Sequence, residues 1–464
     1  MKPVFREVYT FDKKCYEKYK LTEDILMEHA ANAMAEVIKA KVKKGSTINI
    51  VSGPGNNGAD GITLGRILLG DYKINLYLPL GAKSEMAKLQ LERFLAVGGE
   101  VKETYERCEC LVDAIFGSGL KRDLPKDIAC MIKKMNHIDA LKIACDIPTG
   151  IDDEGNLRPI AFKADITVTM GAEKLSLYSD MAKDYVGEII RADLGVSFSK
   201  YRGKSDYHVW ERSDLALPIR KKQNSHKRTY GHLGVLAGDK KGAAVLAAKA
   251  AFNFGCGLVS VVSHEYFNIP YEIMFSEKIE NHFNSLAFGM GMGNYFDDEI
   301  DKLLSMNVPM VIDADMFYKE EIKEFLKKDK IVLTPHPKEF ASLLKILGFG
   351  EFSPSEIQKN RFRLSEEFSK KYPKVVLLLK GANKIIAFNK KLHIDPLGSV
   401  ALAKGGSGDV LAGMIGGLLA QGYHPFKATI MASLAHSIAG NYEPNYALTP
   451  EKLIKRLEEI ARIS

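Results

Sequence analysis

Residues 404–413 of this 464-residue chain read KGGSGDVLAG, and this stretch decides how the second half of the chain is interpreted. Three glycines within four residues allow the backbone to take positive φ angles and to approach a ligand closely. Apolar residues recur at helical spacing over 410–418, which predicts that Ser407 and Gly408 begin a helix. Amides at a helix start, with the positive end of the helix dipole, suit an anionic phosphate. Asp409, in the first turn, would then accept a proton from a hydroxyl beside that phosphate. The structural alternative is an ordinary glycine loop before a helix.

The overall composition is that of an ordinary globular protein. Hydrophobic residues make up 46% and charged residues 27% of the chain, and a chain of this length favours two or three domains. The net charge of +7, from 65 basic and 58 acidic residues, is too mild to indicate a nucleic-acid partner. We therefore expect anionic small molecules as substrates, with neither nucleic acid nor a membrane as partner.

Cysteine usage and apolar windows bear on the compartment. The six cysteines form no CxxC pair, which predicts neither a zinc site nor a disulfide framework and favours a reducing compartment. The N-terminus lacks the apolar core of a signal peptide. The most apolar window, 243–262, contains Lys249 and two glycines, so we interpret it as a buried helix and strand rather than a membrane span. We expect a cytoplasmic protein.

A glycine-rich loop, GPGNNGADG at 53–61, follows a predicted strand at 47–52. It contains G-x-G-x-x-G, but the next strand ends in Pro79 without a carboxylate for a ribose, which makes a standard dinucleotide site doubtful. The asparagine pair offers oxygens to a cation and N–H groups to a phosphate, so this loop is suited to bind both. The alternative is a structural turn rich in Gly and Asn.

Strands followed by short polar loops recur through the first half. Because the carboxyl ends of parallel strands share one edge of a sheet, this pattern predicts a parallel sheet with its ligand at that edge. Asp113 lies within one such strand, and Asp146 ends the next, just before a Pro turn. Either carboxylate alone would more often hold its own loop, but their common place beside glycine loops favours function. We expect strands at 111–116, 141–147, 165–170 and 186–192.

The pattern breaks in a polar, aperiodic segment over 193–206, so we place a domain boundary there, giving domains 1–205 and 206–464. The second half then resumes with further strands, each leading into a loop. These loops read GMGMG (289–293), DAD (313–315), TPHPKEF (334–340) and KGANK (380–384).

Together, these motifs resemble those of bifunctional NAD(P)H-hydrate repair enzymes over nearly the whole chain. The first half reads NNGAD (56–60), DAIFGSGL (113–120) and DIPTG (146–150), similar to the NNGGD, DALFGTGL and DIPSG of NAD(P)HX epimerase domains of the YjeF N-terminal type. The second half resembles ADP/ATP-dependent NAD(P)HX dehydratases, whose motifs are GPGLG, DAD, TPHPGEF, KGxxT and GTGD. This chain departs from the pattern at Ala59, Lys338 and Lys384.

The resemblance implies an α/β fold of two domains, an N-terminal Rossmann-like three-layer αβα domain and a C-terminal ribokinase-like αβα domain. It implies epimerisation of R- and S-NAD(P)HX, the hydrates of NADH and NADPH, and nucleotide-dependent dehydration of the S form. In the dehydratases of this family the C6 hydroxyl is phosphorylated and phosphate is then eliminated, so ADP yields AMP and phosphate. The family also tends to form homo-oligomers.

For the epimerase half, the resemblance implies Asp146 as the proton-transfer residue. Potassium would be held by the oxygen donors of Asn57, Asp113 and Thr149. Residues implied to bind NAD(P)HX in this half are Asn56, Asn57, Gly58, Ala59, Asp60, Gly117, Ser118, Gly119, Leu120, Lys121, Arg122, Asp123 and Asp146.

For the dehydratase half, the resemblance implies Asp409 as the base, with the Ser407 and Gly408 amides and Mg²⁺ holding the transferring phosphoryl group. Residues implied to line the NAD(P)HX pocket there are Ala243, Gly291, Gly293, His336 and Asp409. Those implied to bind ADP or AMP are Lys380, Gly381, Ala382, Asn383, Lys384 and Gly408. Lys384 replaces the usual Thr, which changes one phosphate contact, although a lysine also binds phosphate.

Two alternatives stay open at this point. The second half is also compatible with a ribokinase-type kinase for a vitamin precursor, which uses the same GxGD aspartate; the fused NNGAD domain argues against it. The first half is also compatible with a non-catalytic nucleotide-binding module. The presence of Asp60, Asp113 and Asp146 argues against that second alternative.

Overall fold

The computed structural model describes residues 1–104 and 107–460, and the chain divides into two compact units. One unit is Pro3–Ser205, and the other joins Met1–Lys2 to Asp206–Ser464. A short strand, β1 (Lys2–Val4), begins the chain. Over the described ranges, we find no helix with both the length and the apolar character needed to cross a bilayer.

The N-terminal unit is built on a parallel sheet, as the repeated strand and loop pattern predicts. The strand order is β4-β3-β2-β5-β6-β7-β8, and all neighbours are parallel. Each predicted strand is found, with ends that differ by up to two residues. The strands are β2 (Thr47–Ser52), β3 (Lys73–Tyr77), β4 (Val101–Lys102), β5 (Cys110–Ala114), β6 (Leu141–Cys145), β7 (Ile166–Met170) and β8 (Glu188–Ala192).

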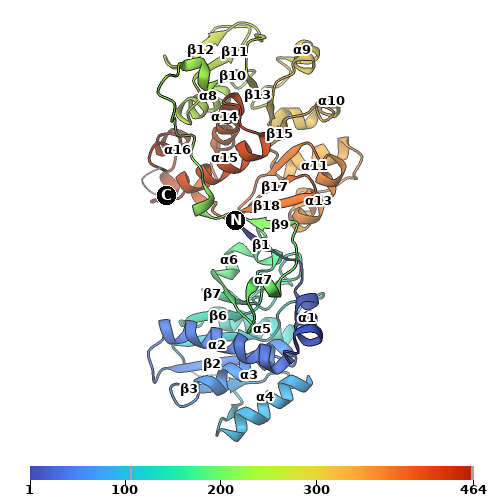
Figure 1. Ribbon diagram of the computed structural model, residues 1–464, viewed down its shortest axis with the longest axis vertical. Coiled ribbons are helices and arrows are strands. Elements are labelled where there is room, and N and C mark those ends of the chain that lie inside the picture. The colour runs from blue at the N-terminus through green and yellow to red at the C-terminus, as the bar shows by residue number, and fades with distance from the viewer. Residues whose placement is uncertain (105–106, 461–464) are drawn as a thin grey trace. The chain divides into compact units, whose positions relative to one another are not determined.

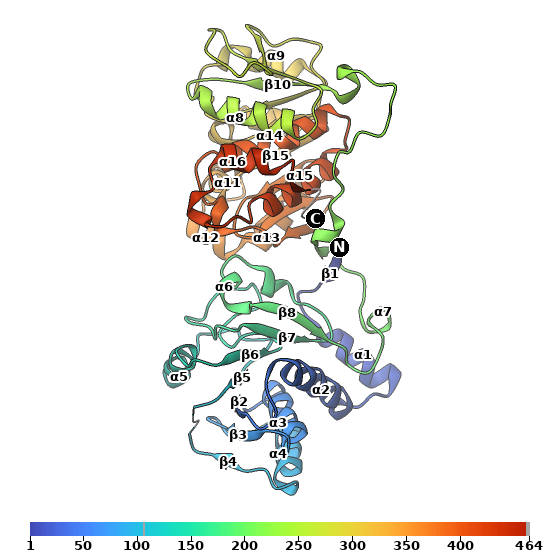
Figure 2. The ribbon, with the colours of Figure 1, turned by 90° about the vertical axis from the view of Figure 1, so that its left-hand side faces the viewer.

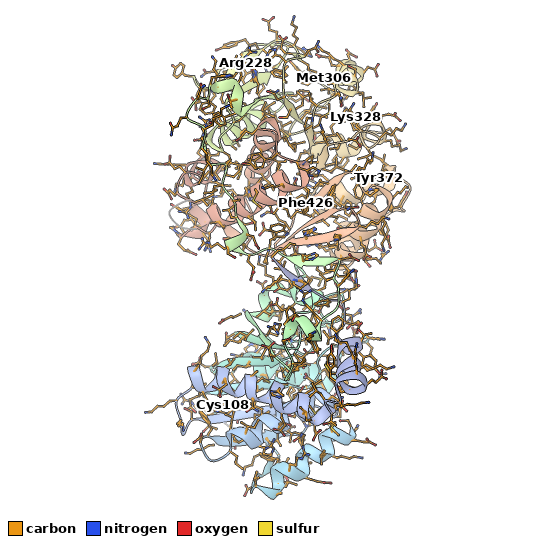
Figure 3. All side chains as sticks on the ribbon, in the orientation of Figure 1. Cys108, Arg228, Met306, Lys328, Tyr372 and Phe426 are labelled. Atoms are coloured by element: carbon orange, nitrogen blue, oxygen red, sulfur yellow. The ribbon has the colours of Figure 1, made fainter. Side chains whose placement is uncertain are left out.

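Helices cover both faces of this sheet, and Figure 2 shows α5 on one side with α2, α3 and α4 on the other. The face under α5 is a small core in which Ile128 and Ile132 pack with Leu111 and the buried Cys108, labelled in Figure 3. The helices are α1 (Tyr9–Tyr19), α2 (Glu23–Lys41), α3 (Asn56–Leu68), α4 (Glu85–Ala96), α5 (Lys126–Asn136), α6 (Lys183–Val186) and α7 (Phe198–Tyr201).

The C-terminal unit has a larger, mixed sheet. From β9 the order runs β9-β18-β17-β16-β15-β14-β13-β10-β11-β12, with β17 antiparallel to both of its neighbours and the other pairs parallel. The strands are β9 (Tyr207–Val209), β10 (His232–Leu236), β11 (Leu258–Val262), β12 (Met274–Ser276), β13 (Ser285–Phe288), β14 (Met310–Ile312), β15 (Ile331–Leu333), β16 (Val376–Leu379), β17 (Lys384–Phe388) and β18 (Lys391–Asp395).

Small residues let α8 and α14 pack closely on one side of this sheet, where Figure 1 also shows α15. A side chain at Gly413 would run into the backbone carbonyl of Ala247, so the close helix approach requires glycine there. The helices are α8 (Lys241–Asn253), α9 (Ile300–Ser305), α10 (Ile322–Phe325), α11 (Pro337–Ile346), α12 (Pro354–Lys359), α13 (Arg361–Lys371), α14 (Ser407–Ala420), α15 (Pro425–Ala439) and α16 (Pro450–Arg456).

One local expectation was wrong at its last residue. We expected 380–384 to be a loop after a strand, but Lys384 instead begins β17, which forms an antiparallel hairpin with β18. The predicted start of α14 at Ser407, with Asp409 in its first turn, is confirmed.

Candidate active sites

A cavity of about 960 Å³ lies at the carboxyl ends of the N-terminal strands. Its walls come from the loops after β2 and β5, the end of β6, the segment after β7, and α1. Gly58 and Ala59, which we expected to bind the substrate, do not line this cavity and are buried within α3. The sequence-predicted residues that the structure brings to the cavity wall are Asn56, Asn57, Asp60, Gly117, Ser118, Gly119, Leu120, Lys121, Arg122, Asp123 and Asp146.

Asp146 follows β6 with a backbone φ of 68°, a left-handed conformation that is uncommon for a residue other than glycine. Such strain persists where the surrounding structure fixes it, and it concentrates at functional sites. Burial raises the pKa of this carboxyl, but the ion pair with Lys174 and the amides of Met170 and Ser118 outweigh burial and hold the pKa below its ordinary value. Asp146 is therefore a carboxylate at neutral pH.

Asp60 lines the same cavity from the first turns of α3, and its pKa is shifted in the opposite direction. Burial, followed by repulsion from Asp146 and Asp12, raises the pKa of Asp60 well above its ordinary value. One cavity thus holds two carboxyls whose pKa values are shifted in opposite directions. Two carboxyls with pKa values pushed apart can serve as proton donor and proton acceptor.

The sequence motifs missed part of this wall. Lys174, after β7, also lines the cavity, as do four residues of α1 or its approach, Val8, Tyr9, Asp12 and Tyr16. The α1 segment shows weak apolar periodicity, with Cys15 as its one buried member, so its sequence gave little signal of a helix against the site.

Asp113 and Thr149 meet behind the cavity wall. Oγ1 of Thr149 donates to Oδ1 of Asp113 at 2.7 Å and to the carbonyl of Phe116 at 3.1 Å. Burial raises the pKa of Asp113 to about 6, although hydrogen bonds from Thr149 and Ile115 offset part of it. The side-chain nitrogen of Asn57 is buried without a hydrogen-bond partner in the described structure. Asp113 and Thr149 bring a carboxylate and a hydroxyl oxygen together here, and oxygens are the ligands that hard cations prefer.

Gly117 allows two of these side chains to approach the loop after β5. A Cβ at this position would lie 2.7 Å from Oδ1 of Asn57 and 3.1 Å from Oδ2 of Asp146. The exposed Lys121 and Arg122 follow in the same loop. The loop therefore places two cations beside the cavity and lets the carboxylate and amide reach its backbone, which suits an anionic substrate.

In the C-terminal unit, the loops after β13, β14, β15 and β16 lie at one edge because these strands are parallel neighbours. Lys380, after β16, donates to Oδ1 of Asp313, after β14, at 2.8 Å, and lies 3.7 Å from Glu339. Burial lowers the pKa of Lys380, but Asp313 and Glu339 outweigh burial and raise it. This lysine is a fixed positive charge at the end of the sheet.

The start of α14 faces that charge. The Lys380 ammonium lies 3.5 Å from the place that a Cβ on Gly408 would take. Burial and the charge of Asp313 raise the pKa of Asp409 to about 6, and Lys380 offsets part of the rise. The helix start, the lysine and a carboxyl that titrates near neutrality therefore converge, as phosphoryl transfer to a hydroxyl requires.

His336 is the N-cap of α11, so it is fixed rather than free in a loop. Its Nδ1 accepts from the amides of Lys338 and Glu339, and its Nε2 lies 3.1 Å from Oε1 of Glu339. Burial and the positive charge of Lys380 lower the pKa of His336. Glu339 also lies beside Lys380, so it connects His336 with Lys380, two residues that the sequence predicted for this site.

Ala243, Gly291 and Gly293 gather next to Lys240. The Lys240 amide donates to the carbonyl of Gly291 at 2.9 Å, and the Ala243 amide donates to the carbonyl of Lys240. The amide of Gly293 donates to Oδ2 of Asp315 at 2.9 Å. These contacts hold the loop after β13 against the start of α8 and against the segment after β14.

The KGANK segment divides between the site and the core. Gly381 and Ala382 are exposed, whereas Asn383 and Lys384 are buried. The guanidinium of Arg361, which the motifs did not indicate, donates to the carbonyls of Lys380 and Asn383 and so fixes this backbone.

Lys384 is not brought to Lys380. Its ammonium lies 3.2 Å from Oδ2 of Asp395 and donates to Ser437, inside the unit. We expected the positive charge of Lys384 to face a nucleotide phosphate, but this charge is already paired with Asp395.

Comparison with known families matches both halves of the chain. A family described as NAD(P)H-hydrate dehydratase (Carb_kinase) matches residues 233–461, and one described as YjeF-related protein N-terminus matches residues 23–176.

Individual relatives extend over almost the entire length. The bifunctional NAD(P)H-hydrate repair enzyme Nnr of Helicobacter pylori is 43% identical over 472 residues, covering 99% of this chain and 100% of that protein. The enzyme of the same name from Dictyoglomus turgidum is 30% identical, with 97% and 96% covered. A crystal structure of the ADP/ATP-dependent NAD(P)H-hydrate dehydratase of Bacillus subtilis, co-crystallised with ATP and Mg²⁺, matches with a TM-score of 0.47 and 25% identity over 55% of this chain and 98% of that one.

Proposed function

This chain belongs to the family of bifunctional NAD(P)H-hydrate repair enzymes, and from this premise we propose that each unit carries one of the two repair activities. The enzyme interconverts the R and S hydrates of NADH and NADPH and, with ADP or ATP, dehydrates the S hydrate to the reduced dinucleotide. Since relatives match both halves together, a vitamin-precursor kinase fused to an idle binding module is set aside.

Epimerisation at C6 requires a proton donor and a proton acceptor. The hydroxyl of the hydrate is on C6, which is bonded to the ring nitrogen. When the hydroxyl is protonated, the nitrogen electron pair forms the N1=C6 bond as the C6–O bond breaks and water leaves. Water then adds to either face of this planar cation and loses a proton, which restores the hydroxyl in the R or S configuration. In the N-terminal cavity, Asp60, whose pKa is raised, is the proton donor, and Asp146, whose pKa is lowered, is the acceptor.

Potassium belongs to the same site. Asn57, Asp113 and Thr149 would hold it, since their oxygens include the buried carboxyl of Asp113, which accepts hydrogen bonds from Thr149 and from the amide of Ile115. When bound, the ion supplies a positive charge beside the loop after β5. The exposed Lys121 and Arg122 on that loop bind the phosphates of the substrate.

Dehydration takes place at the start of α14. Asp409 removes the proton of the C6 hydroxyl as its oxygen attacks the terminal phosphorus of ADP or ATP, and AMP or ADP leaves. The ring nitrogen then expels phosphate from C6, and loss of a proton from C5 restores the reduced ring. The Ser407 and Gly408 amides and Lys380 stabilise the transferring phosphoryl group.

Mg²⁺ arrives with the nucleotide in this proposal. Among the described residues, no cluster of three or more His, Cys, Asp or Glu side chains is arranged to hold a metal ion. Mg²⁺ is commonly held by one or two carboxylates together with substrate phosphates, and the carboxylate that fits this part is Asp313. The ion neutralises charge on the phosphates.

The nucleotide itself is assigned to Lys380, Gly381, Ala382, Asn383 and Gly408. Because the Lys384 ammonium is paired with Asp395, Lys384 contributes by holding β17 in place rather than by charge. The proposal extends to a cytoplasmic homo-oligomer. The six cysteines are free thiols, which fits a reducing compartment, and the assembly follows the habit of the family.

The convergence of Asp409, Lys380 and the start of α14 carries this function. Its test is recovery of the reduced-nicotinamide absorbance from mixed R- and S-NADPHX with ADP or ATP, Mg²⁺ and K⁺. Full recovery of the mixture supports both activities. Recovery that stops when the S form is consumed contradicts the epimerase assignment, and no recovery with either nucleotide contradicts the dehydratase assignment.

A further inference from the structure

Lys174 is a buried lysine in the wall of the N-terminal cavity that no sequence motif indicated. Its side chain is 1% exposed, and it follows β7 in the segment that closes the cavity beside Asp146. Its backbone is held as well, since the amide of Leu175 donates to the carbonyl of Phe5 and the amide of Phe5 donates to the carbonyl of Glu173.

The ammonium of Lys174 has three acceptors for its three N–H groups. It pairs with Oδ1 of Asp146, donates to Oγ1 of Thr169 at 3.1 Å and donates to the carbonyl of Met170 at 2.8 Å. A lysine with all donors used in this way has little freedom to bind a substrate itself. Its effect on the reaction must pass through Asp146.

The two oxygens of Asp146 have different surroundings. Oδ1 receives Lys174, the amide of Met170 at 3.1 Å and the hydroxyl of Thr169 at 3.4 Å. Oδ2 receives a long bond of 3.3 Å from the amide of Ser118, in the loop that lines the cavity. The saturated oxygen faces the protein, and the weakly bonded one remains for a substrate proton.

We propose that Lys174 is a positioning residue for epimerisation, which holds Oδ1 of Asp146 so that Oδ2 faces the hydrate in the cavity. The inference rests on the proposed role of Asp146. A structural salt bridge is the competing explanation, since removing one partner of a buried pair destabilises a fold whatever its function. Besides Lys174, ionisable groups that interact with Asp146 include Asp12 of α1, Asp60 of α3, Cys145 of β6 and Tyr201 of α7.

A double-mutant cycle on the full chain separates the two explanations. Lys174→Met, Asp146→Asn and the double variant are assayed for conversion of R-NADPHX to the S form without nucleotide. We expect Lys174→Met to lower kcat on the order of 100-fold with KM changed less than about threefold, since misplaced groups cost rate more than binding. Added to Asp146→Asn, the same change should alter the residual rate less than about threefold, because Lys174 acts through Asp146.

The matched control is Lys163→Met, an exposed lysine close to the start of β7, which should keep the wild-type rate. Dehydration of S-NADPHX, measured on every variant, should stay unchanged because it belongs to the other unit. Lys174→Met alone leaves Asp146 as an unpaired buried charge, whereas Lys174→Met/Asp146→Asn removes both charges. If Lys174→Met alone does not fold, the cycle is completed with Lys174→Arg, which keeps the positive charge.

Each result decides between the explanations. Wild-type kcat in Lys174→Met or Lys174→Arg, or a full further loss when either is added to Asp146→Asn, overturns the positioning role. Wild-type epimerisation by Asp146→Asn alone overturns the proposed function of that carboxylate instead, and so the two failures are distinct.

Discussion

The ammonium of Lys380 lies 2.8 Å from Oδ1 of Asp313, and this pair joins the ends of β16 and β14 beside the start of α14. The lysine also lies close to Glu339, so one cation balances two buried carboxylates. A nucleotide phosphate at Gly408 would come within reach of the same cation. Lys380 therefore links the architecture of the site with the charge of its ligand.

Lys380→Arg tests that link while keeping the charge. Because the guanidinium is planar and larger, it cannot place one nitrogen both on Asp313 and beside Gly408, so we expect kcat/KM for dehydration to fall by about 10²–10³. Epimerisation should be unchanged. Lys374→Met, which breaks an exposed pair with Asp329, is the matched control and should keep both activities. Wild-type dehydration by Lys380→Arg would remove this residue from phosphoryl transfer.

Asp409→Asn should abolish dehydration and leave epimerisation intact. Loss of a positioned general base typically costs about 10²–10⁴ in rate, and Asn keeps the size of the side chain. S-NADPHX consumption with ADP and R-to-S conversion without nucleotide are measured on the same preparation. If both activities disappear while the thermal unfolding curve stays unchanged, the two sites are coupled or the assignment is wrong.

The pH dependence of dehydration follows from the pKa of Asp409. Burial and Asp313 raise that pKa to about 6, and the base is active when ionised. Dehydration kcat/KM should therefore be constant above about pH 7, reach half of that value near pH 6 and fall about tenfold per unit well below it. The epimerase rate in the same buffers serves as the comparison. A dehydration profile that is flat from pH 7 to about pH 5 would contradict Asp409 as the base.

The sequence predicted those parts of the fold that local patterns encode. Short apolar strands before glycine loops predicted the parallel sheet of the N-terminal unit, and GSGD before an apolar helical run predicted the start of α14. Ligands bind at the carboxyl ends of parallel strands, and this rule singled out Asp146, which directly follows β6.

Residues that act through long-range contacts had no such signal. Lys174 sits in an ordinary GAEK turn, and only the packing of β6 against β7 brings it to Asp146. Lys384 and Asp395 face one another because β17 and β18 form a hairpin, which the KGANK motif does not encode. Helix α1 has weak apolar periodicity, so tertiary contacts rather than sequence pattern reveal its place at the cavity.

Removal of potassium should affect epimerisation alone. The proposed ligands Asp113 and Thr149 are in the N-terminal unit, so replacing K⁺ by a tetraalkylammonium ion should lower the R-to-S rate and leave dehydration unchanged. Asp113→Asn removes the buried negative charge and should abolish the response to K⁺, with epimerisation reduced at every K⁺ concentration. A wild-type K⁺ response in Asp113→Asn would place the ion elsewhere.

Lys384 should act on stability rather than on nucleotide binding. Lys384→Met leaves Asp395 buried without its cation, which should cost about 3–5 kcal/mol in the free energy of unfolding. Burial raises the pKa of Asp395, but Lys384, Ser433 and Ser437 outweigh burial and lower it. A lowered folded pKa means that this contribution is present above about pH 4 and is lost as the pH falls further.

Urea unfolding at neutral pH and near pH 3 measures that contribution, and the penalty of Lys384→Met should shrink at the lower pH. Lys384→Met/Asp395→Asn removes both charges and should lose less stability than Lys384→Met alone, because no charge is left unpaired while the amide still accepts from the hydroxyls of Ser433 and Ser437. The KM for ADP is measured on the double variant at a temperature where it is folded. An unchanged KM supports a structural role, whereas a large rise in KM with unchanged stability would return Lys384 to the nucleotide site.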